Sequence, residues 1–263
     1  MSDDIFNSKL LEKAKRFFIE TAEITKFTGR LIREMVRPPF EHQELLMQCY
    51  KIGYQSLPLI SLTGFILGLV ITMQTRPVLV EFGAEAWLPG MVAVSLIREI
   101  GPVIIALICA GKLGSSMGAE LGSMRVTEQI DAMEVSGINP MKYLVATRVL
   151  AATLMVPLLI IYADAIALYG SYVGANIHGN LSFSLFITQA FDWLYYIDVL
   201  PAFVKTFFFG FAIGLIGCYK GYSAKYGTEE VGKAANAAVV SASVWVFVID
   251  LVAVQITDII TRI

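Results

Sequence analysis

Hydrophobic residues in this sequence gather in long runs instead of alternating with polar positions. Five stretches reach the length of about 20 mainly apolar residues that a helix needs to cross a bilayer. They are Ile52 to Thr75, Ala86 to Gly111, Val149 to Ile177, Val199 to Tyr219 and Ala234 to Thr257. The pattern therefore predicts an all-α integral membrane protein with five transmembrane helices.

The first stretch contains Pro58. Proline has no backbone N–H and its ring clashes with the preceding helical turn. The first span is therefore continuous, broken at the proline or partly re-entrant, and the sequence leaves these forms open.

Composition agrees with a membrane protein. The chain of 263 residues is 56% hydrophobic and 16% charged, whereas soluble chains are about 25% charged. A net charge of −2 gives no reason to expect a nucleic acid partner. The three cysteines, Cys49, Cys109 and Cys218, lack a CxxC spacing, so neither a disulfide nor a metal site is predicted.

Positive charges are distributed unequally between the segments that join the five stretches. If the N-terminus is cytoplasmic, the cytoplasmic segments hold 16 of the 20 Lys and Arg residues, and the outer segments hold only Arg76 and Arg262. Because Lys and Arg accumulate on the cytoplasmic side of membrane proteins, we expect a cytoplasmic N-terminus and a C-terminus on the opposite side.

Residues 1–39 form a separate segment with helical periodicity. Apolar or small residues recur at spacings of three and four from Leu10 to Met35, and Lys and Arg outnumber Glu around them. An amphipathic helix of this composition suits the anionic cytoplasmic surface of a bilayer. The alternative is a helix that packs on a soluble partner. Residues 40–263 are then a single transmembrane domain.

Residues 112–148, between the second and third stretches, are too many for a simple connection. Within this cytoplasmic loop, residues 123–135 predict one short helix, because their apolar residues fall on one side and Gly137 can cap the C-terminus. Such a helix either docks a partner or lies at the lipid headgroups, and its spacing favours neither.

Charged residues inside a membrane usually have a partner or face water. At about 1.5 Å per residue, Lys205 and Asp250 lie about 9 and 10 Å below the outer ends of their spans, so we predict an ion pair between them. We interpret the pair as structural, with a role in transport as the alternative. Asp164 follows Pro157 by seven residues, which indicates a buried acid at a helix kink.

Arg98 and Glu99 are neighbours in the second span. Adjacent helical residues point about 100° apart, so the two cannot face one partner. One faces a dimer axis or a lipid headgroup while the other pairs inside the chain.

Glycines recur at four-residue spacing in several of the stretches, a pattern typical of closely packed membrane helices. The examples are Gly64/Gly68, Gly114/Gly118/Gly122, Gly170/Gly174 and Gly210/Gly214. We expect tight helix packing at these positions.

Residues 95–151 carry an ordered set of motifs. They are REIGPV (98–103), AGKLGS (110–115), AELGSMRVTEQIDAME (119–134) and NP (139–140). This set resembles the MlaE/YrbE family, the permease subunits of ABC-type lipid transporters linked to MCE-domain proteins. The sequence departs from the family where Lys112 replaces the usual Arg and where Ala146-Thr147-Arg148 replaces the usual Pro-Arg, without loss of a charge.

The resemblance implies a homodimer in a bacterial inner membrane, with the C-terminus periplasmic. It implies a cytoplasmic ATPase dimer that binds ATP and Mg, a periplasmic MCE-domain protein and phospholipid as cargo. It also makes residues 123–135 the helix that couples the permease to the ATPase. The residues assigned to coupling are Glu120, Arg125, Glu128, Asp131 and Glu134.

A lipid cavity needs apolar walls, and the outer half of the first span offers them. The candidate cavity residues are Leu67, Val70, Ile71, Val78 and Leu79, with Arg98 and Glu99 for headgroup contact.

The chain is not expected to be an enzyme. It contains no Walker A pattern, so ATP must be hydrolysed by another chain, and no cofactor or metal is expected in this one. The alternative function is an ion-coupled secondary carrier that uses Glu99, Asp164 and Asp250. We find no inverted repeat of the kind such carriers contain.

Overall fold

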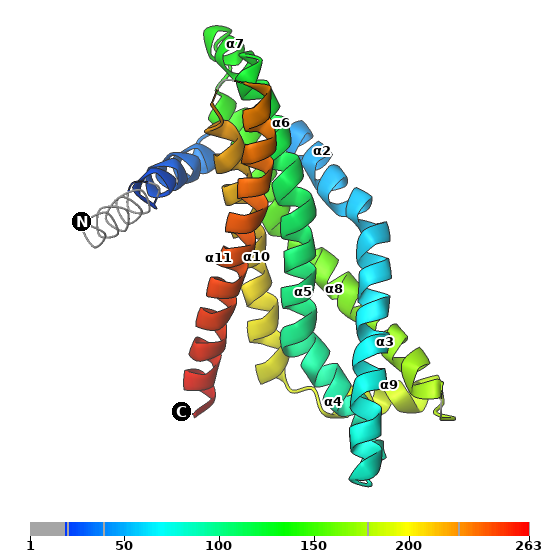
Figure 1. Ribbon diagram of the computed structural model, residues 1–263. Coiled ribbons are helices and arrows are strands. Elements are labelled where there is room, and N and C mark those ends of the chain that lie inside the picture. Colours follow the sequence, from blue (N-terminus) through cyan, green and yellow to red (C-terminus); the bar gives the residue numbers. More distant parts are fainter. Residues whose placement is uncertain (1–18, 20, 39, 178, 226, 263) are drawn as a thin grey trace, which may run out of the picture.

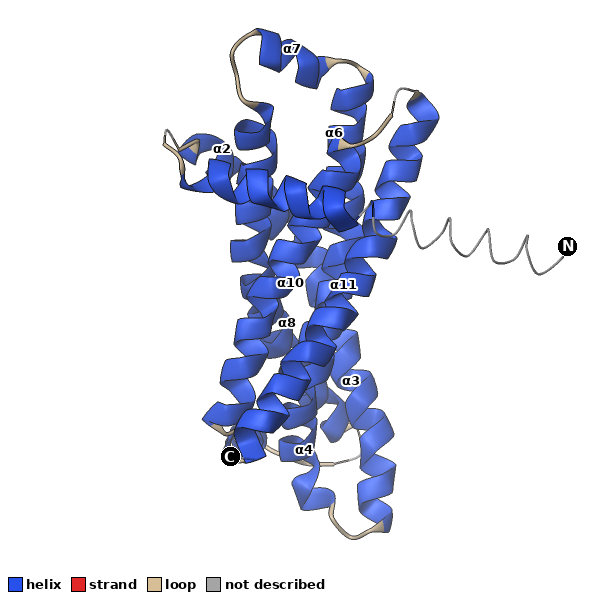
Figure 2. Cartoon of the chain, turned by 90° about the vertical axis from the view of Figure 1, so that its left-hand side faces the viewer, coloured by secondary structure: helices blue, strands red, loops and turns tan. Residues whose placement is uncertain are grey.

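The fold is helical throughout the part of the chain that the computed structural model describes, residues 19, 21–38, 40–177, 179–225 and 227–262. Within these residues no strand occurs (Figure 2). Five helical units are long and apolar enough to cross a membrane: His42–Glu81, Glu85–Val126, Met141–Asn176, Tyr196–Tyr222 and Glu229–Ile260. The prediction of an all-helical protein with five spans is confirmed.

The N-terminal helix covers residues 21–36 in the described chain, and the first part of the predicted amphipathic stripe lies outside the described residues. Phe27 and Leu31 are buried, whereas the basic side chains of the helix are exposed. The helix leaves the bundle sideways, across the direction of the spans (Figure 1). Its predicted amphipathic character holds over the described part.

The first span is broken just before Pro58. Helix α2 (His42–Gly53) passes through a single 3₁₀ turn (Tyr54–Ser56) into α3 (Leu57–Glu81). Pro58 cannot donate to the carbonyl four residues before it, that of Tyr54, which accepts from the backbone N–H of Leu57 instead. The ammonium group of Lys112 donates a hydrogen bond to the carbonyl oxygen of Gln55 in this turn, so a neighbouring span stabilises the break.

The second and third spans are longer than the apolar pattern predicts. The second is built from a 3₁₀ turn (Glu85–Trp87), α4 (Leu88–Ser95), a π-helical turn (Leu96–Ile100), α5 (Gly101–Cys109), a second π-helical turn (Ala110–Gly114) and α6 (Ser115–Val126). The third begins with a π-helical segment (Met141–Ala146) and continues as α8 (Thr147–Asn176). Most of residues 112–148, expected as a loop, therefore extends these two helices.

The prediction of a single helix over residues 123–135 is wrong. Helix α6 ends at Val126, and α7 spans Gln129–Val135. Glu128 between them has a φ of 58°, a left-handed conformation that cannot continue a right-handed helix.

The C-terminus of α7 has the predicted glycine cap. Gly137 has a φ of 79°. Its N–H donates to the carbonyl of Glu134, and the N–H of Ile138 donates to the carbonyl of Met133, both at 3.0 Å. These two bonds form a Schellman motif, which ends the helix and satisfies its last carbonyls.

Glycines bring the spans into backbone contact, as their spacing predicts. A Cβ added to Gly68 of α3 would overlap the carbonyl of Ala167 in α8, and one added to Gly170 would overlap the carbonyl of Phe65. Gly210, in α10 (Tyr196–Tyr222), packs in the same way on α8. The close contacts lie within one chain.

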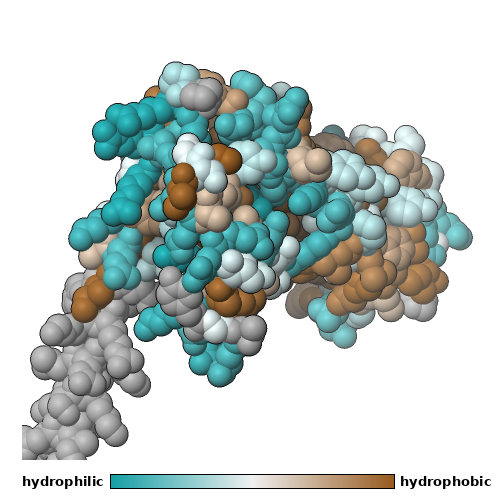
Figure 3. Space-filling model, turned by 90° about the horizontal axis from the view of Figure 1, so that it is seen from above, coloured by the Kyte–Doolittle hydropathy of each residue, from teal (hydrophilic) through white to brown (hydrophobic). Residues whose placement is uncertain are grey.

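The two ends of the bundle differ. Helix α7 and the N-terminal helix lie toward one end (the α7 end). Helix α9 (Phe183–Asp192), α4 and the C-terminal end of α11 (Thr228–Arg262) lie at the other (Figure 1). Viewed from the α7 end, the surface is mostly hydrophilic, and hydrophobic residues gather at its flank (Figure 3).

Candidate functional site

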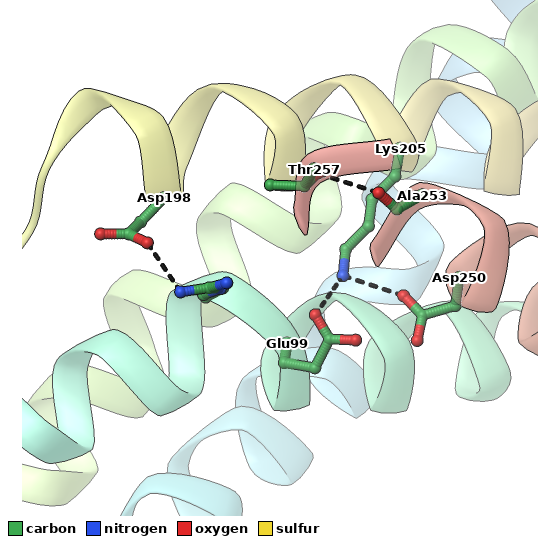
Figure 4. A network of polar contacts seen from close by, with 7 residues as sticks. Glu99, Asp198, Lys205, Asp250, Ala253 and Thr257 are labelled. Atoms are coloured by element: carbon green, nitrogen blue, oxygen red, sulfur yellow. Dashed lines mark hydrogen bonds and ion pairs between the residues drawn. The ribbon is translucent and has the colours of Figure 1, made fainter. Parts of the chain in front are cut away.

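A buried ammonium group joins three of the five spans. The Nζ atom of Lys205, on α10, lies 2.7 Å from Oε2 of Glu99 and 2.8 Å from Oδ1 of Asp250 on α11. The Lys205 side chain is only 4% exposed. Figure 4 shows both carboxylates directed at the same nitrogen. Because a buried charge is stable only with close partners, these contacts fix the relative positions of the three helices.

A second ion pair lies beside this cluster. Arg98, in the same π-helical turn as Glu99, places Nη1 3.0 Å from Oδ1 of Asp198 in the first turn of α10 (Figure 4). The whole group consists of two cations and three carboxylates: Arg98, Lys205, Glu99, Asp198 and Asp250. When all five are ionised, it carries a net charge of −1.

The predicted pair Lys205–Asp250 is confirmed. Arg98 and Glu99 have different partners, as predicted, but both pair inside the chain, whereas only one of them was expected to do so. Sequence reasoning named Glu99 but did not place it with Lys205, and it missed Asp198. Asp198 lies inside α10, which begins at Tyr196, three residues before the predicted span. The sequence prediction compared the membrane depths of charged residues in the last two spans only. The same comparison over all five spans is the signal that could have offered Glu99 as a third partner.

A small pocket opens on this group between α10 and α11. Four of the five charged residues line it, all except Asp250. The rest of the lining is Pro201, Ala202, Ala253, Val254 and Thr257. Its cavity volume of about 20 Å³ accommodates about one water molecule. A lipid chain does not fit into this pocket of a single chain.

The five apolar cavity candidates do not share one surface. Leu79 is buried, and Leu67 and Ile71 pack beside it against α4, α8 and α9. Val70 and Val78 are 39% and 53% exposed and point away from this core.

Asp164 is separate from the Lys205 group. It lies in α8 after Pro157, as predicted, and its Oδ1 atom is buried against the Cα of Gly101. Among the described residues this oxygen has no hydrogen-bond partner.

The predicted coupling residues divide into two kinds. Four have partners within the chain: Arg125 pairs with Asp131, Glu120 pairs with Arg148, and Glu134 accepts a hydrogen bond from the hydroxyl of Tyr222. Glu128, in the turn before α7, is exposed. The Arg125–Asp131 and Tyr222–Glu134 contacts attach α7 to α6 and α10.

Helix α7 also exposes an apolar side chain. Ile130 is fully buried against the bundle, whereas Val135 is 91% exposed and Ile138 is 47% exposed. The helix thus has an inner face bound to its own chain and an outer face open to a partner. The sequence did not separate these faces, because the break at Glu128 changes which residues point outward.

The fold and site define a class, a polytopic helical membrane protein with a buried ion cluster between its spans and an exposed helix between the second and third. The family described as Permease MlaE matches residues 45–256. The chain belongs to this family of ABC transporter permeases, whose members do not themselves hydrolyse ATP.

Known relatives agree with the family. The chain is 37% identical to a probable ABC transporter permease protein of Rickettsia typhi. The 222 aligned residues cover 84% of this chain and 86% of the relative. It is 36% identical over 211 residues to the intermembrane phospholipid transport system permease protein MlaE of Haemophilus influenzae, 79% and 80% of the two chains. The chloroplastic protein TRIGALACTOSYLDIACYLGLYCEROL 1 of Arabidopsis thaliana is 30% identical over 224 residues, 85% of this chain and 64% of the relative.

Proposed function

We propose that this chain is the permease subunit of an ABC transporter that moves phospholipids or related lipids between the inner membrane and the periplasm or outer membrane. Energy comes from a separate ATPase that binds ATP and Mg. The relative from Haemophilus influenzae, named for intermembrane phospholipid transport, supports lipid as cargo. The observation that carries the proposal is α7, which is exposed on its outer face and bound to its own spans on its inner face.

The ATPase is proposed to dock on α7. Glu128 and Val135 offer an exposed carboxylate and an exposed apolar side chain to it. The remaining coupling residues act from inside. Arg125–Asp131 and Tyr222–Glu134 connect α7 to α6 and α10, and Glu120–Arg148 connects α6 to α8. A movement of α7 is thereby transmitted to the spans.

This assignment sets the orientation. The α7 end and the N-terminal helix face the cytoplasm, and the C-terminus faces the periplasm, where an MCE-domain protein is the expected partner. The excess of Lys and Arg in the segments on the α7 side supports this orientation.

The lipid path is proposed to lie between two copies of the chain. The pocket beside Lys205 is too small for a lipid, while α11 exposes Val244, Phe247 and Leu251 and α3 exposes Val70 and Val78. These apolar side chains supply walls for a cavity at a dimer interface. The Lys205 cluster would then hold the spans that line it.

The ion-coupled carrier has less support. Two of its three proposed carboxylates, Glu99 and Asp250, are already engaged by Lys205. Only Asp164 offers a buried carboxylate oxygen without a hydrogen-bond partner in the described chain.

A reconstitution experiment tests the proposal. The chain with its ATPase is placed in vesicles, and transfer of a fluorescent phospholipid to acceptor vesicles is followed with ATP, without ATP and with an ion gradient alone. ATP-dependent transfer is expected. Glu128→Lys should abolish coupling while the protein still inserts, whereas Lys225→Gln, at an exposed position outside α7, should have no effect. Transfer driven by the ion gradient alone would instead establish the carrier.

A further inference from the structure

The N-terminal helix carries a stripe of cations on its exposed side. Lys26, Arg30 and Arg33 are all exposed, and at about 100° per residue they fall within an arc of about 60°. Phe27 and Leu31 lie on the buried side, centred about 110° around the helix from the cations. The helix thus presents a positive surface away from the bundle.

Two apolar side chains lie beside this stripe. Ile32 is 51% exposed and Val36 is 73% exposed. Exposed apolar residues flanked by cations fit the boundary between headgroups and acyl chains, where phosphates meet the cations and the apolar side chains enter the hydrocarbon. The chemistry that this surface matches is an anionic lipid headgroup.

The buried side of the N-terminal helix packs on α10, and α10 in turn contacts α7. The Phe27 ring lies 5.4 Å from the Tyr219 ring and 5.9 Å from the Tyr222 ring, measured between centroids. The Tyr219 hydroxyl donates to Glu23 of the N-terminal helix at 3.1 Å. The Tyr222 hydroxyl donates to Glu134 of α7 at 3.4 Å. Tyr222 therefore contacts both the N-terminal helix and α7.

A second connection lies just after α7. The side-chain amide of Asn139 donates to Oε2 of Glu34 at 3.0 Å. Together with Tyr222, this bond attaches the C-terminal end of α7 to the N-terminal helix at two points. A shift of the N-terminal helix relative to the bundle must change at least one of them.

We propose that the N-terminal helix is a binding site for anionic lipid headgroups, and that its occupancy positions α7 for productive coupling to the ATPase. Negatively charged lipid in the cytoplasmic leaflet would then activate the transporter. The inference rests on the proposed function, because it takes α7 as the element that docks the ATPase. Each cation near an anionic membrane surface contributes about fivefold in affinity, so three in one stripe contribute about a hundredfold together.

The complex of this chain with its ATPase can be tested in phosphatidylcholine vesicles with and without phosphatidylglycerol. The quantity measured is lipid transferred per ATP hydrolysed. The wild-type complex is expected to transfer several-fold more lipid per ATP when phosphatidylglycerol is present. This stimulation should shrink as salt is added, because salt screens exposed charges.

Two sets of variants separate lipid binding from its transmission. The triple variant Lys26→Gln, Arg30→Gln, Arg33→Gln should lose the stimulation, whereas Lys225→Gln removes an exposed cation elsewhere and should keep it. The double variant Tyr222→Phe, Asn139→Ala retains the basic stripe. It should still bind phosphatidylglycerol vesicles but lose the stimulation of transfer.

Equal transfer per ATP in both vesicle types, or full stimulation in the triple variant, would overturn the inference. It would also be overturned if the triple variant lost its ATPase in detergent, since the stripe would then bind a protein surface. Failure of the proposed function has a different signature, transfer that does not depend on ATP at all. ATP-driven transfer that ignores phosphatidylglycerol would reject only the lipid site.

Discussion

Glu120 and Arg148 form an ion pair of 2.9 Å in which the two partners are buried to very different extents. The Arg148 side chain is 3% exposed and the Glu120 side chain 43%. Arg148 also donates to the carbonyl of Leu144 at 2.9 Å. The pair connects α6 with the beginning of α8, the two helices that precede and follow α7 in the chain.

This asymmetry predicts unequal effects of single substitutions. Glu120→Gln leaves a buried guanidinium without a carboxylate and should destabilise the protein by about 3 kcal/mol or more. Arg148→Met leaves a carboxylate that water can reach and should be milder. Thermal unfolding in detergent measures both, and the double variant should be more stable than Glu120→Gln alone. Equal losses in the two single variants would contradict this account.

The Lys205 cluster predicts strong non-additivity. Lys205→Met leaves Glu99 and Asp250 facing each other without a cation, so it should lower the unfolding temperature. Adding Asp250→Asn removes the repulsion and should recover part of the loss. Simple addition of the two shifts would mean that the ion pair does not contribute in the folded protein.

The contact between α3 and α8 predicts intolerance of any side chain at two glycines. Gly68→Ala and Gly170→Ala place a Cβ against a backbone carbonyl of the other helix, and such overpacking costs about 1–3 kcal/mol. Gly232→Ala is the matched control, because nothing lies within 4 Å of its Cβ position. Comparable stability of all three variants would show that the helices separate without loss.

Asp164 distinguishes ATP-driven lipid transport from ion-coupled transport. Asp164→Asn removes a carboxylate that has a buried oxygen without a hydrogen-bond partner in the described chain, and it hardly changes the shape of the side chain. The variant should unfold at the same or a higher temperature and retain ATP-driven lipid transfer. Loss of transfer in a stable variant would point to proton or ion coupling at this position.

The spans and one ion pair were predictable because both depend on local properties of the sequence. Apolar runs of sufficient length give the five spans, and matched depth gives Lys205 with Asp250. The ends of the second and third spans were not predictable in this way. Lys112, Glu120 and Arg148 resemble loop residues in the sequence, but each is satisfied by a partner on another helix.

The break at Glu128 and the contact of Glu99 with Lys205 depend on long-range geometry. No residue preference marks Glu128 for a left-handed conformation, since glycine or asparagine is the usual occupant. Glu99 contacts Lys205 from a π-helical turn. The angle between successive side chains differs there from that of an α-helix, so a regular helical projection does not predict the direction of Glu99. These features require the packed bundle to be known.

The π-helical turns have a consequence for changes in chain length. A π-helical turn holds one residue more than an α-helical turn, so removing one residue there restores a regular helix and leaves the flanking side chains facing as before. The same deletion in the middle of α8 would rotate every later position by about 100° and turn the buried Ala167 away from α3. Relatives with one residue fewer inside a span are therefore expected to lack it at Leu96–Ile100, Ala110–Gly114 or Met141–Ala146.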